Sequence, residues 1–437
     1  MLQQYKGGEN FDLRDILLQG KRLSLRQRVS SFSSFLKNLS EQKQFLCMRC
    51  ITSAADREVT VVDPYSGREK TMLMFGSNNY LGLANHRYVR EYVERTIREY
   101  GVGIGGPPLL NGYTNLHREL ELRLAALKGT EDAMIFSTGY GANVGLVTGL
   151  VAANDRVICD TYSHASFSDG VKMSGARSFK FAHNDVARLR KMLELHCDGR
   201  AHEVFVGVEG VYSMDGDLAP LDVIVRLCRE FGAVLMLDDA HGTGIMGEHG
   251  RGTAEHFGVE GNVDITMGTF SKTFGAVGGF VAASKPVIDY LRFFARPYMF
   301  SASLPPTVVA TVLAGLDVME HEPGLIARFR ENVRYAAEGL RGLGFELYPQ
   351  SGIIPLRVPI GMNIRSASFQ FHERGIFMNS IEYPAVPVSQ QRFRISIMAT
   401  HTRQDIDRLL TAVDAVWTGF RSGTMQSETG SASAANC

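Results

Sequence analysis

The chain has 437 residues, enough for one large domain and a smaller one, and 45% of them are hydrophobic. Lys plus Arg and Asp plus Glu number 46 each, so no net charge attracts nucleic acid or an anionic membrane, which favours a small-molecule enzyme. No stretch approaches the roughly 18 apolar residues of a membrane span, and the N-terminus lacks a secretory signal. We therefore expect a cytoplasmic protein with no transmembrane segment.

Residues 1–74 are predicted to form an N-terminal arm and strands of a small domain. Positions 12–41 have a helical pattern rich in Leu, Arg and Ser. The sequence DPYSG at 63–67 then predicts a turn between two short strands, around Val59 and Leu73.

Residues 75–315 are predicted to form a large domain. Helical patterns alternate here with short apolar runs, as in a mostly parallel sheet that has helices on both faces, so the predicted fold class is α/β. The runs are AMIF (133–136), RVICD (156–160), EVFVGV (203–208), AVLML (233–237) and DITMG (264–268).

Residues 316–420 are predicted to form a smaller C-terminal α+β domain, and the Ser/Gly/Ala-rich residues 421–437 a disordered tail. The elements expected in this domain are helices at about 326–340 and 405–417, and strands at 345–349 (FELYP), 353–358 (IIPLRV) and 392–396 (RFRIS).

Polar groups follow every apolar run of the large domain. Ligands of open α/β sheets bind outside the carboxyl ends of the strands, so these groups are predicted to line one crevice. In the order of the runs they are Thr138, Gly139 and Tyr140; His164; Ser213; Asp238 and His241; and Thr269 and Lys272.

These groups match the requirements of pyridoxal 5'-phosphate (PLP). The glycine-rich turn at 138–141 offers backbone N–H groups to a phosphate. Lys272, in GTFSK, can form a Schiff base with an aldehyde. Asp238 can keep a pyridine nitrogen protonated, and His164 and His241 can stack on the ring or approach its hydroxyl.

Taken singly, each of these residues could have an ordinary structural role. Lys272 alone would be a surface lysine, Asp238 and Asp239 could cap a helix, and His164 could be held by hydrogen bonds within the fold. The joint placement of all of them at strand ends is what favours the PLP site.

Two other motifs are interpreted as incidental. Cys47 and Cys50 form a C-x-x-C motif, but a zinc site needs a second pair, so no metal site is expected. GVGIGG at 101–106 fits the dinucleotide fingerprint, yet it follows a predicted helix and precedes Pro107-Pro108, which disfavours an NAD-binding oxidoreductase.

Several longer motifs point to a family. They are SNNYLGL (77–83), LNGYTNLHRELE (110–121), FSTGYGAN (136–143), SHAS (163–166), EGVYSMDGD (209–217), DDAHGTG (238–244), GTFSK (268–272) and FSASLPP (300–306). With these motifs the chain resembles the α-oxoamine synthases, fold-type-I PLP transferases, and in particular their serine palmitoyltransferase and 8-amino-7-oxononanoate synthase branches.

The resemblance implies a homodimer with shared active sites and a role for each site residue. Lys272 would hold PLP, His164 would stack on its ring, and Asp238 would pair with the pyridine nitrogen. The other implied positions are His241 and Ser213 near the ring hydroxyl, Thr138, Gly139, Tyr140 and Thr269 around the phosphate, and Asn78 and Arg394 at the amino-acid carboxylate. Taken alone, Arg394 could also be a surface arginine of a strand.

The reaction that the resemblance implies is a decarboxylative Claisen condensation of serine, alanine or glycine with an acyl-CoA or acyl-carrier-protein thioester, giving a 2-amino ketone. An aminotransferase or a decarboxylase on the same fold is the alternative, and a non-catalytic partner subunit would be expected to lack Lys272. The chain departs from the family pattern at two places. Pro107-Pro108 replace Ser-Arg near the substrate entrance, which favours an unusual acyl donor such as a carrier-protein thioester. Glu382 replaces an arginine of the palmitoyltransferase branch, and because an acid there does not favour a substrate carboxylate, it argues against a simple transfer of that enzyme's identity.

Overall fold

Seven short segments form the central sheet of the computed structural model, which describes residues 23–199 and 202–423. In sheet order they are β4 (Asp132–Phe136), β10 (Gly279–Ala283), β9 (Ile265–Thr269), β8 (Val234–Asp238), β7 (Val204–Glu209), β5 (Arg156–Asp160) and β6 (Arg177–Phe181). β10 is antiparallel to both of its neighbours, and every other neighbouring pair is parallel. The mostly parallel sheet and its five predicted strands are therefore confirmed.

Helices cover both faces of this sheet. Successive side chains of a strand point to opposite faces, so one strand can contribute to an apolar cluster on each face. Met134 and Phe136 of β4 belong to one apolar cluster with α5 (Gly139–Leu150) and α10 (Lys285–Phe294). Ala133 and Ile135 belong to another with α4 (Asn115–Lys128) and α12 (Pro306–His321). The remaining helices of this part are η1 (Leu83–Asn85), α3 (Arg87–Tyr100), α6 (Ala165–Ser174), α7 (Val186–His196), α8 (Leu221–Phe231), α9 (Thr253–His256) and α11 (Arg296–Met299).

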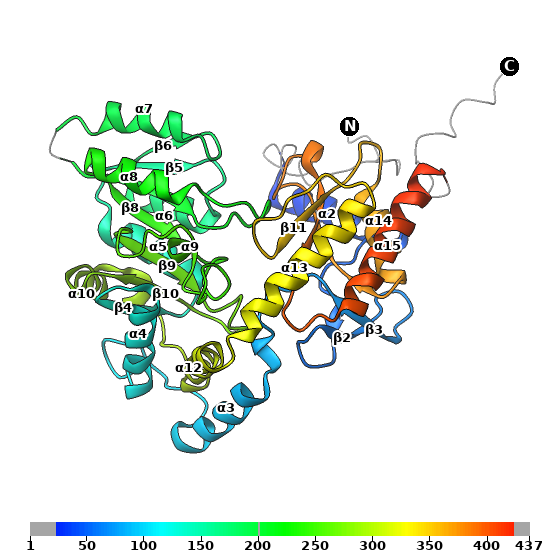
Figure 1. Ribbon diagram of the computed structural model, residues 1–437, viewed down its shortest axis with the longest axis horizontal. Coiled ribbons are helices and arrows are strands. Elements are labelled where there is room, and N and C mark those ends of the chain that lie inside the picture. Colours follow the sequence, from blue (N-terminus) through cyan, green and yellow to red (C-terminus); the bar gives the residue numbers. More distant parts are fainter. Residues whose placement is uncertain (1–22, 200–201, 424–437) are drawn as a thin grey trace.

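Two smaller sheets lie on the other side of the molecule in Figure 1, with α13 running beside them. One has the order β11 (Ile353–Arg357), β14 (Arg392–Ser396), β13 (Asn379–Ile381), and the other β1 (Cys50–Ile51), β2 (Glu58–Val62), β3 (Glu69–Met74), β12 (Ile376–Phe377). Their helices are α2 (Leu25–Glu41), α13 (Gly324–Gly342), α14 (Ile364–Glu373), η2 (Val388–Gln390) and α15 (Arg403–Arg421). The predicted early strands and their turn at 63–67 are confirmed, as are the C-terminal helices.

One predicted strand is wrong. Residues 345–349 have no strand geometry, although their side chains alternate between half-buried and exposed as the pattern predicted. Instead, the ring of Phe345 packs edge-on against Trp417 at 5.3 Å, and Tyr348 is 81% exposed.

The predicted arm and domain limits are only partly covered by the structure. The arm helix spans Leu25–Glu41, and the part of the prediction before residue 23 lies outside the described residues, as does most of the predicted tail. The boundary predicted at residue 315 lies inside α12, and the domain division stays a prediction. Among residues 23–199 and 202–423, no helix combines the length and apolar character needed to cross a membrane.

Candidate active site

The carboxyl ends of β4, β5, β7, β8 and β9 meet at a cavity of about 420 Å³. Every site residue predicted from the sequence lines it, and residues from the smaller sheets close one side. These residues are Asn78, Thr138, Gly139, Tyr140, His164, Ser213, Asp238, His241, Thr269, Lys272 and Arg394.

Lys272 lies in this cavity just after β9. Burial lowers its pKa to about 8, while Asp238 and Glu209 oppose that shift through their charge. Within the described residues, no group accepts a hydrogen bond from its ammonium. The ammonium is therefore still the major form at neutral pH, but the free amine is far more populated than in an exposed lysine, which suits Schiff-base formation.

Two carboxyl groups stand side by side beyond the sheet edge, because Asp238 and Glu209 are register partners on β8 and β7. Asp238 accepts hydrogen bonds from Asn143 Nδ2 at 2.7 Å and from the Ala240 N–H at 3.1 Å. Burial, together with the charge of Asp238, raises the pKa of Glu209 well above its usual value, and Glu209 Oε1 has no partner among the described residues. The shift favours the neutral form of Glu209 beside Asp238.

The start of α5 offers hydrogen-bond donors to an anion. Thr138 caps the helix and takes up the Gly141 N–H at 2.8 Å, which leaves the N–H groups of residues 139 and 140 at the positive end of the helix. A Cβ atom on Gly139 would lie 2.7 Å from Thr269 Oγ1, so glycine is needed there. The Tyr140 hydroxyl donates to Asp169, so the backbone of Tyr140 is the part that suits an anion.

Two neutral imidazole rings line the cavity. Nδ1 of His164 accepts from the Ser166 N–H at 3.3 Å and lies 2.7 Å from the Ser166 hydroxyl, while Nδ1 of His241 lies 2.8 Å from the Tyr80 hydroxyl. Burial lowers the pKa of both rings, and that of His241 falls well below its usual value. Neutral rings held by Nδ1 in this way can pack on an aromatic ligand without adding charge.

Arg394, on β14, is buried rather than on a strand surface, with 5% of its area exposed. Its Nε donates to the Ser213 carbonyl at 2.7 Å and its Nη1 to Asn78 Oδ1 at 2.9 Å. The buried Nη2 has no partner among the described residues. A guanidinium held on two sides with one nitrogen open is suited to a carboxylate.

The donor set fits PLP. The cavity has a helix start for the phosphate, an amine for the aldehyde, the carboxyl group of Asp238 for the pyridine nitrogen, and two imidazole rings. Buried polar atoms that lack protein partners, among them Arg394 Nη2 and Asn143 Oδ1, are also what a polar ligand would satisfy.

Comparison with known proteins identifies the family. The chain matches the family Aminotransferase class I and II over residues 70–413. The 8-amino-7-oxononanoate synthase of Geotalea daltonii is 40% identical over 388 residues, covering 88% of this chain and 97% of that protein. The serine palmitoyltransferase of Bacteriovorax stolpii is 39% identical over 373 residues, covering 85% and 87%. The chain belongs to the α-oxoamine synthases.

A solved structure agrees with this assignment. The serine palmitoyltransferase of S. paucimobilis, solved with PLP and myriocin bound, has a TM-score of 0.83 and 32% identity, covering 92% of this chain and 100% of that one. The predicted family, the fold-type-I architecture and the PLP cofactor are therefore confirmed. The roles of single residues stay predictions.

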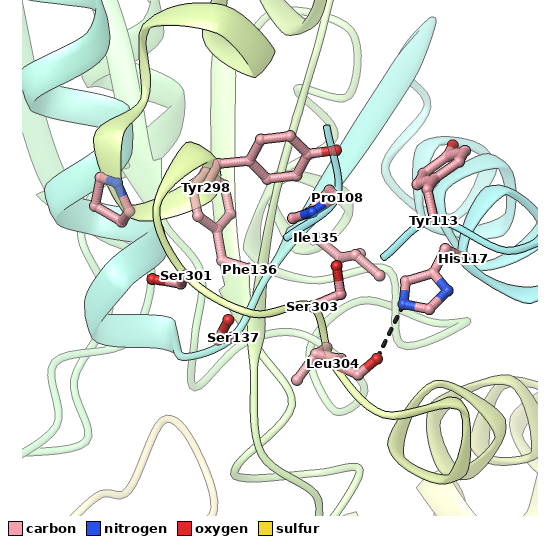
Figure 2. A pocket seen from close by; sticks show the side chains of 11 residues that line it. Pro108, Tyr113, His117, Ile135, Phe136, Ser137, Tyr298, Ser301, Ser303 and Leu304 are labelled. Carbon is pink, nitrogen blue, oxygen red and sulfur yellow. Dashed lines mark hydrogen bonds between the residues drawn. The ribbon is translucent and has the colours of Figure 1, made fainter. Parts of the chain in front are cut away.

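The Pro107-Pro108 departure from the family pattern lies against the segment at 300–306. Figure 2 shows Pro108 with Ser303 and Leu304 around a second, narrow cavity, where His117 Nε2 donates to the Leu304 carbonyl at 3.0 Å. The Ser303 N–H also donates to the Gly106 carbonyl at 3.0 Å. The loop that contains Pro107 and Pro108 is thus packed against, and hydrogen-bonded to, the segment at 300–306.

Sequence reasoning assigned no role to several cavity residues. Asn143 joins the site because it lies one helical turn after Gly139, and its Nδ2 also donates to Ser166 Oγ at 2.9 Å. Glu209 is the last residue of β7, so the strand-end rule already pointed to it. The remaining residues without a predicted role are Ser166, Met214, Ala240, Met267, Ser271, Val277 and Gly278.

Proposed function

We propose that this protein condenses a small amino acid (serine, alanine or glycine) with an acyl thioester and releases CO2, a free thiol and a 2-amino ketone. The observation that carries the proposal is that Lys272 and the open Nη2 of Arg394 line one cavity. The first is an amine that can hold PLP, and the second is a donor that can bind the carboxylate of an amino acid. Relatives named 8-amino-7-oxononanoate synthase and serine palmitoyltransferase support the same class of reaction.

Arg394 and Asn78 are proposed to bind the substrate carboxylate. Asn78 Oδ1 is occupied by Arg394, so its amide nitrogen is the group that can turn toward a ligand. Glu382, the acid found where an arginine was expected, is paired with Arg365 at 2.6 Å. Its charge is therefore offset, and Arg394 is the cation that faces the substrate in the cavity lining.

Lys272 is proposed to move the proton of the substrate Cα. PLP, when bound, supplies an electron sink that stabilises negative charge at that carbon. Lys272 could take up this proton whenever its amine is not bonded to the cofactor, because its lowered pKa of about 8 leaves part of it as the free amine. Asp238 is proposed to keep the ring nitrogen protonated, and its hydrogen bonds from Asn143 and Ala240 hold its carboxyl group in place.

The test is a product balance. The protein is purified with PLP and mixed with each amino acid and a long-chain acyl thioester, carried either by CoA or by acyl-carrier protein, while CO2 and free thiol are measured. We expect one CO2 and one thiol per turnover with one preferred amino acid, and none with Lys272→Ala. Release of CO2 without release of a free thiol would instead indicate a decarboxylase. Transfer of the amino group to a 2-oxo acid would indicate an aminotransferase.

A homodimer that shares its active sites is part of the proposal. Four aromatic side chains on and near α10 are between 48% and 75% exposed, which is a large apolar area for a free surface. They are Tyr290, Phe293, Phe294 and Phe300. Sedimentation of the purified protein, with a Phe293→Glu variant as the comparison, measures whether this face joins two copies. A cytoplasmic location stays a prediction.

A further inference from the structure

A histidine outside the cavity joins two of the loops that line it. His183 follows β6, and its Nδ1 lies 3.1 Å from Asp160 Oδ1, while its Nε2 lies 2.7 Å from Asp217 Oδ2. The ring is enclosed by two aromatic side chains. Tyr162 stacks on it at 4.3 Å, and Tyr212 meets it edge-on at 4.4 Å. One imidazole thus bridges two carboxylates in a largely enclosed setting.

The first carboxylate controls the segment that leads to His164. Asp160 is the last residue of β5 and is fully buried. Its Oδ1 accepts from the Tyr162 N–H at 2.7 Å, which sets the turn between the strand and the helix start at His164. Movement of Asp160 would therefore move the ring that faces the cofactor cavity.

The second carboxylate belongs to the loop that carries Ser213. This loop closes through a bridge between Val211 and Leu218 and through the bond from the Tyr212 N–H to the Asp217 carbonyl at 2.9 Å. The carbonyl of Ser213 in turn accepts from Arg394 Nε. The loop thus lies between the His183 cluster on one side and the cavity on the other.

The charge of the bridge follows from its surroundings. The two aspartates are the charged groups that act on His183, from β5 and from the Ser213 loop, and the Tyr162, Tyr212 and Asn184 side chains around it are neutral. Burial opposes protonation, but the two hydrogen-bonded carboxylates outweigh it and raise the pKa of His183 to about 9. The pKa of His183 in the folded protein lies above the ordinary value. The His183 ring is therefore fully protonated near neutral pH, and it loses its positive charge as pH rises through about 9.

We propose that His183 is a positioning residue whose imidazolium clamps the Ser213 loop to the strand end that leads to His164, and thereby sets the affinity for PLP. His183 is not among the residues that line the cofactor cavity. The inference rests on the PLP site of the proposed function, but not on the identity of the amino acid or the thioester.

The test measures PLP affinity in the absence of substrates. Apoprotein is titrated with PLP, and the dissociation constant is followed by visible absorbance between about pH 7 and pH 10.5, a range that spans the loss of the charge. Two variants remove the clamp: His183→Gln takes away the charge, and Asp217→Asn takes away one of its partners. At about pH 7 both should bind PLP about tenfold more weakly, the equivalent of one charge-assisted hydrogen bond.

The pH dependence separates a charged clamp from simple packing. The ratio of variant to wild-type dissociation constants should fall toward 1 as pH rises through about 9, because the wild-type protein then loses the same charge. Titration of Lys272 affects all proteins alike and cancels in this ratio. The matched control is His249→Gln, which removes the exposed partner of Glu255 and should keep the ratio at 1 throughout.

Two outcomes would overturn the inference. One is a ratio near 1 at neutral pH in both variants, and the other is a raised ratio that does not change with pH, as a loss of packing would give. PLP binding by the wild-type protein tests the cofactor site itself, and the product balance tests the reaction, so the proposed function and this inference fail separately.

Discussion

Replacing Arg394 by lysine tests the proposed carboxylate site most directly. Lysine keeps the positive charge but loses the planar fork that donates to the Ser213 carbonyl and to Asn78 while leaving Nη2 open. One hydrogen bond to a charged group is worth about 1.5–3 kcal/mol. At 1.36 kcal/mol per factor of ten, Arg394→Lys should weaken carboxylate binding by about 10- to 150-fold.

The assay compares two ligands that differ only in the carboxylate. The preferred amino acid and the amino alcohol with the same side chain are each titrated into the PLP-loaded protein, and their dissociation constants are read from the visible absorbance. The wild-type protein should bind the amino acid more tightly than the amino alcohol. In Arg394→Lys the ratio of the two dissociation constants should shrink by about 10- to 150-fold. Binding of the amino alcohol should change little, because it has no carboxylate to lose.

The control is Arg392→Lys. Arg392 lies two residues away on the same strand and is fully buried, but it is paired with Asp215 and does not line the cavity. This variant should lower stability without changing the ligand preference. An unchanged preference in Arg394→Lys, or an equal loss in both variants, would refute the carboxylate role of Arg394.

Three further predictions concern the cofactor site. The rate of PLP uptake by apoprotein should rise with pH up to about 8 and then level off, because the free amine of Lys272 is the reacting form; a rate independent of pH would contradict this. Gly139→Ala places a Cβ 2.7 Å from Thr269 Oγ1, a clash that costs about 1–3 kcal/mol and should weaken PLP binding by about 5- to 150-fold. Gly324→Ala, with open space around it, should leave PLP binding unchanged. Glu209→Gln should leave the PLP dissociation constant within about threefold, because the raised pKa of Glu209 favours its neutral form. Asp238→Asn should weaken PLP binding at least about tenfold, because Asp238 is the carboxyl group proposed to pair with the ring nitrogen; equal effects of the two substitutions would refute these roles.

The cavity could be predicted from the sequence because the strand-end rule needs no tertiary information. Once the apolar runs are placed in a parallel sheet, residues such as Thr138, His164 and Lys272 must lie at one edge. Arg394 and Asn78 could not be placed in this way. They come from segments outside the central sheet, and only the family resemblance pointed to them.

The missed elements have physical reasons. β6 (RSFKF) is an edge strand with mostly exposed or half-exposed side chains, so it lacks an apolar run. β10 (GFVAA) begins with Gly279, where a Cβ would lie 2.7 Å from the Cα of Gly139, a close approach that no pattern reveals. The expected strand at 345–349 failed for the opposite reason. Its alternating pattern is present, but the half-buried side chains serve helix packing, as with Phe345 on Trp417, and not a sheet.

The separation of Arg394 and Asn78 by 316 positions has a consequence for how the protein is made. The groups proposed to hold PLP end at Lys272, so all of them have been synthesised before Arg394 is added to the growing chain. At ordinary rates of synthesis that interval lasts roughly 10 s. A cofactor captured during it would stabilise the unfinished chain by mass action. PLP supply during translation would then affect the yield of folded protein, before any substrate could bind.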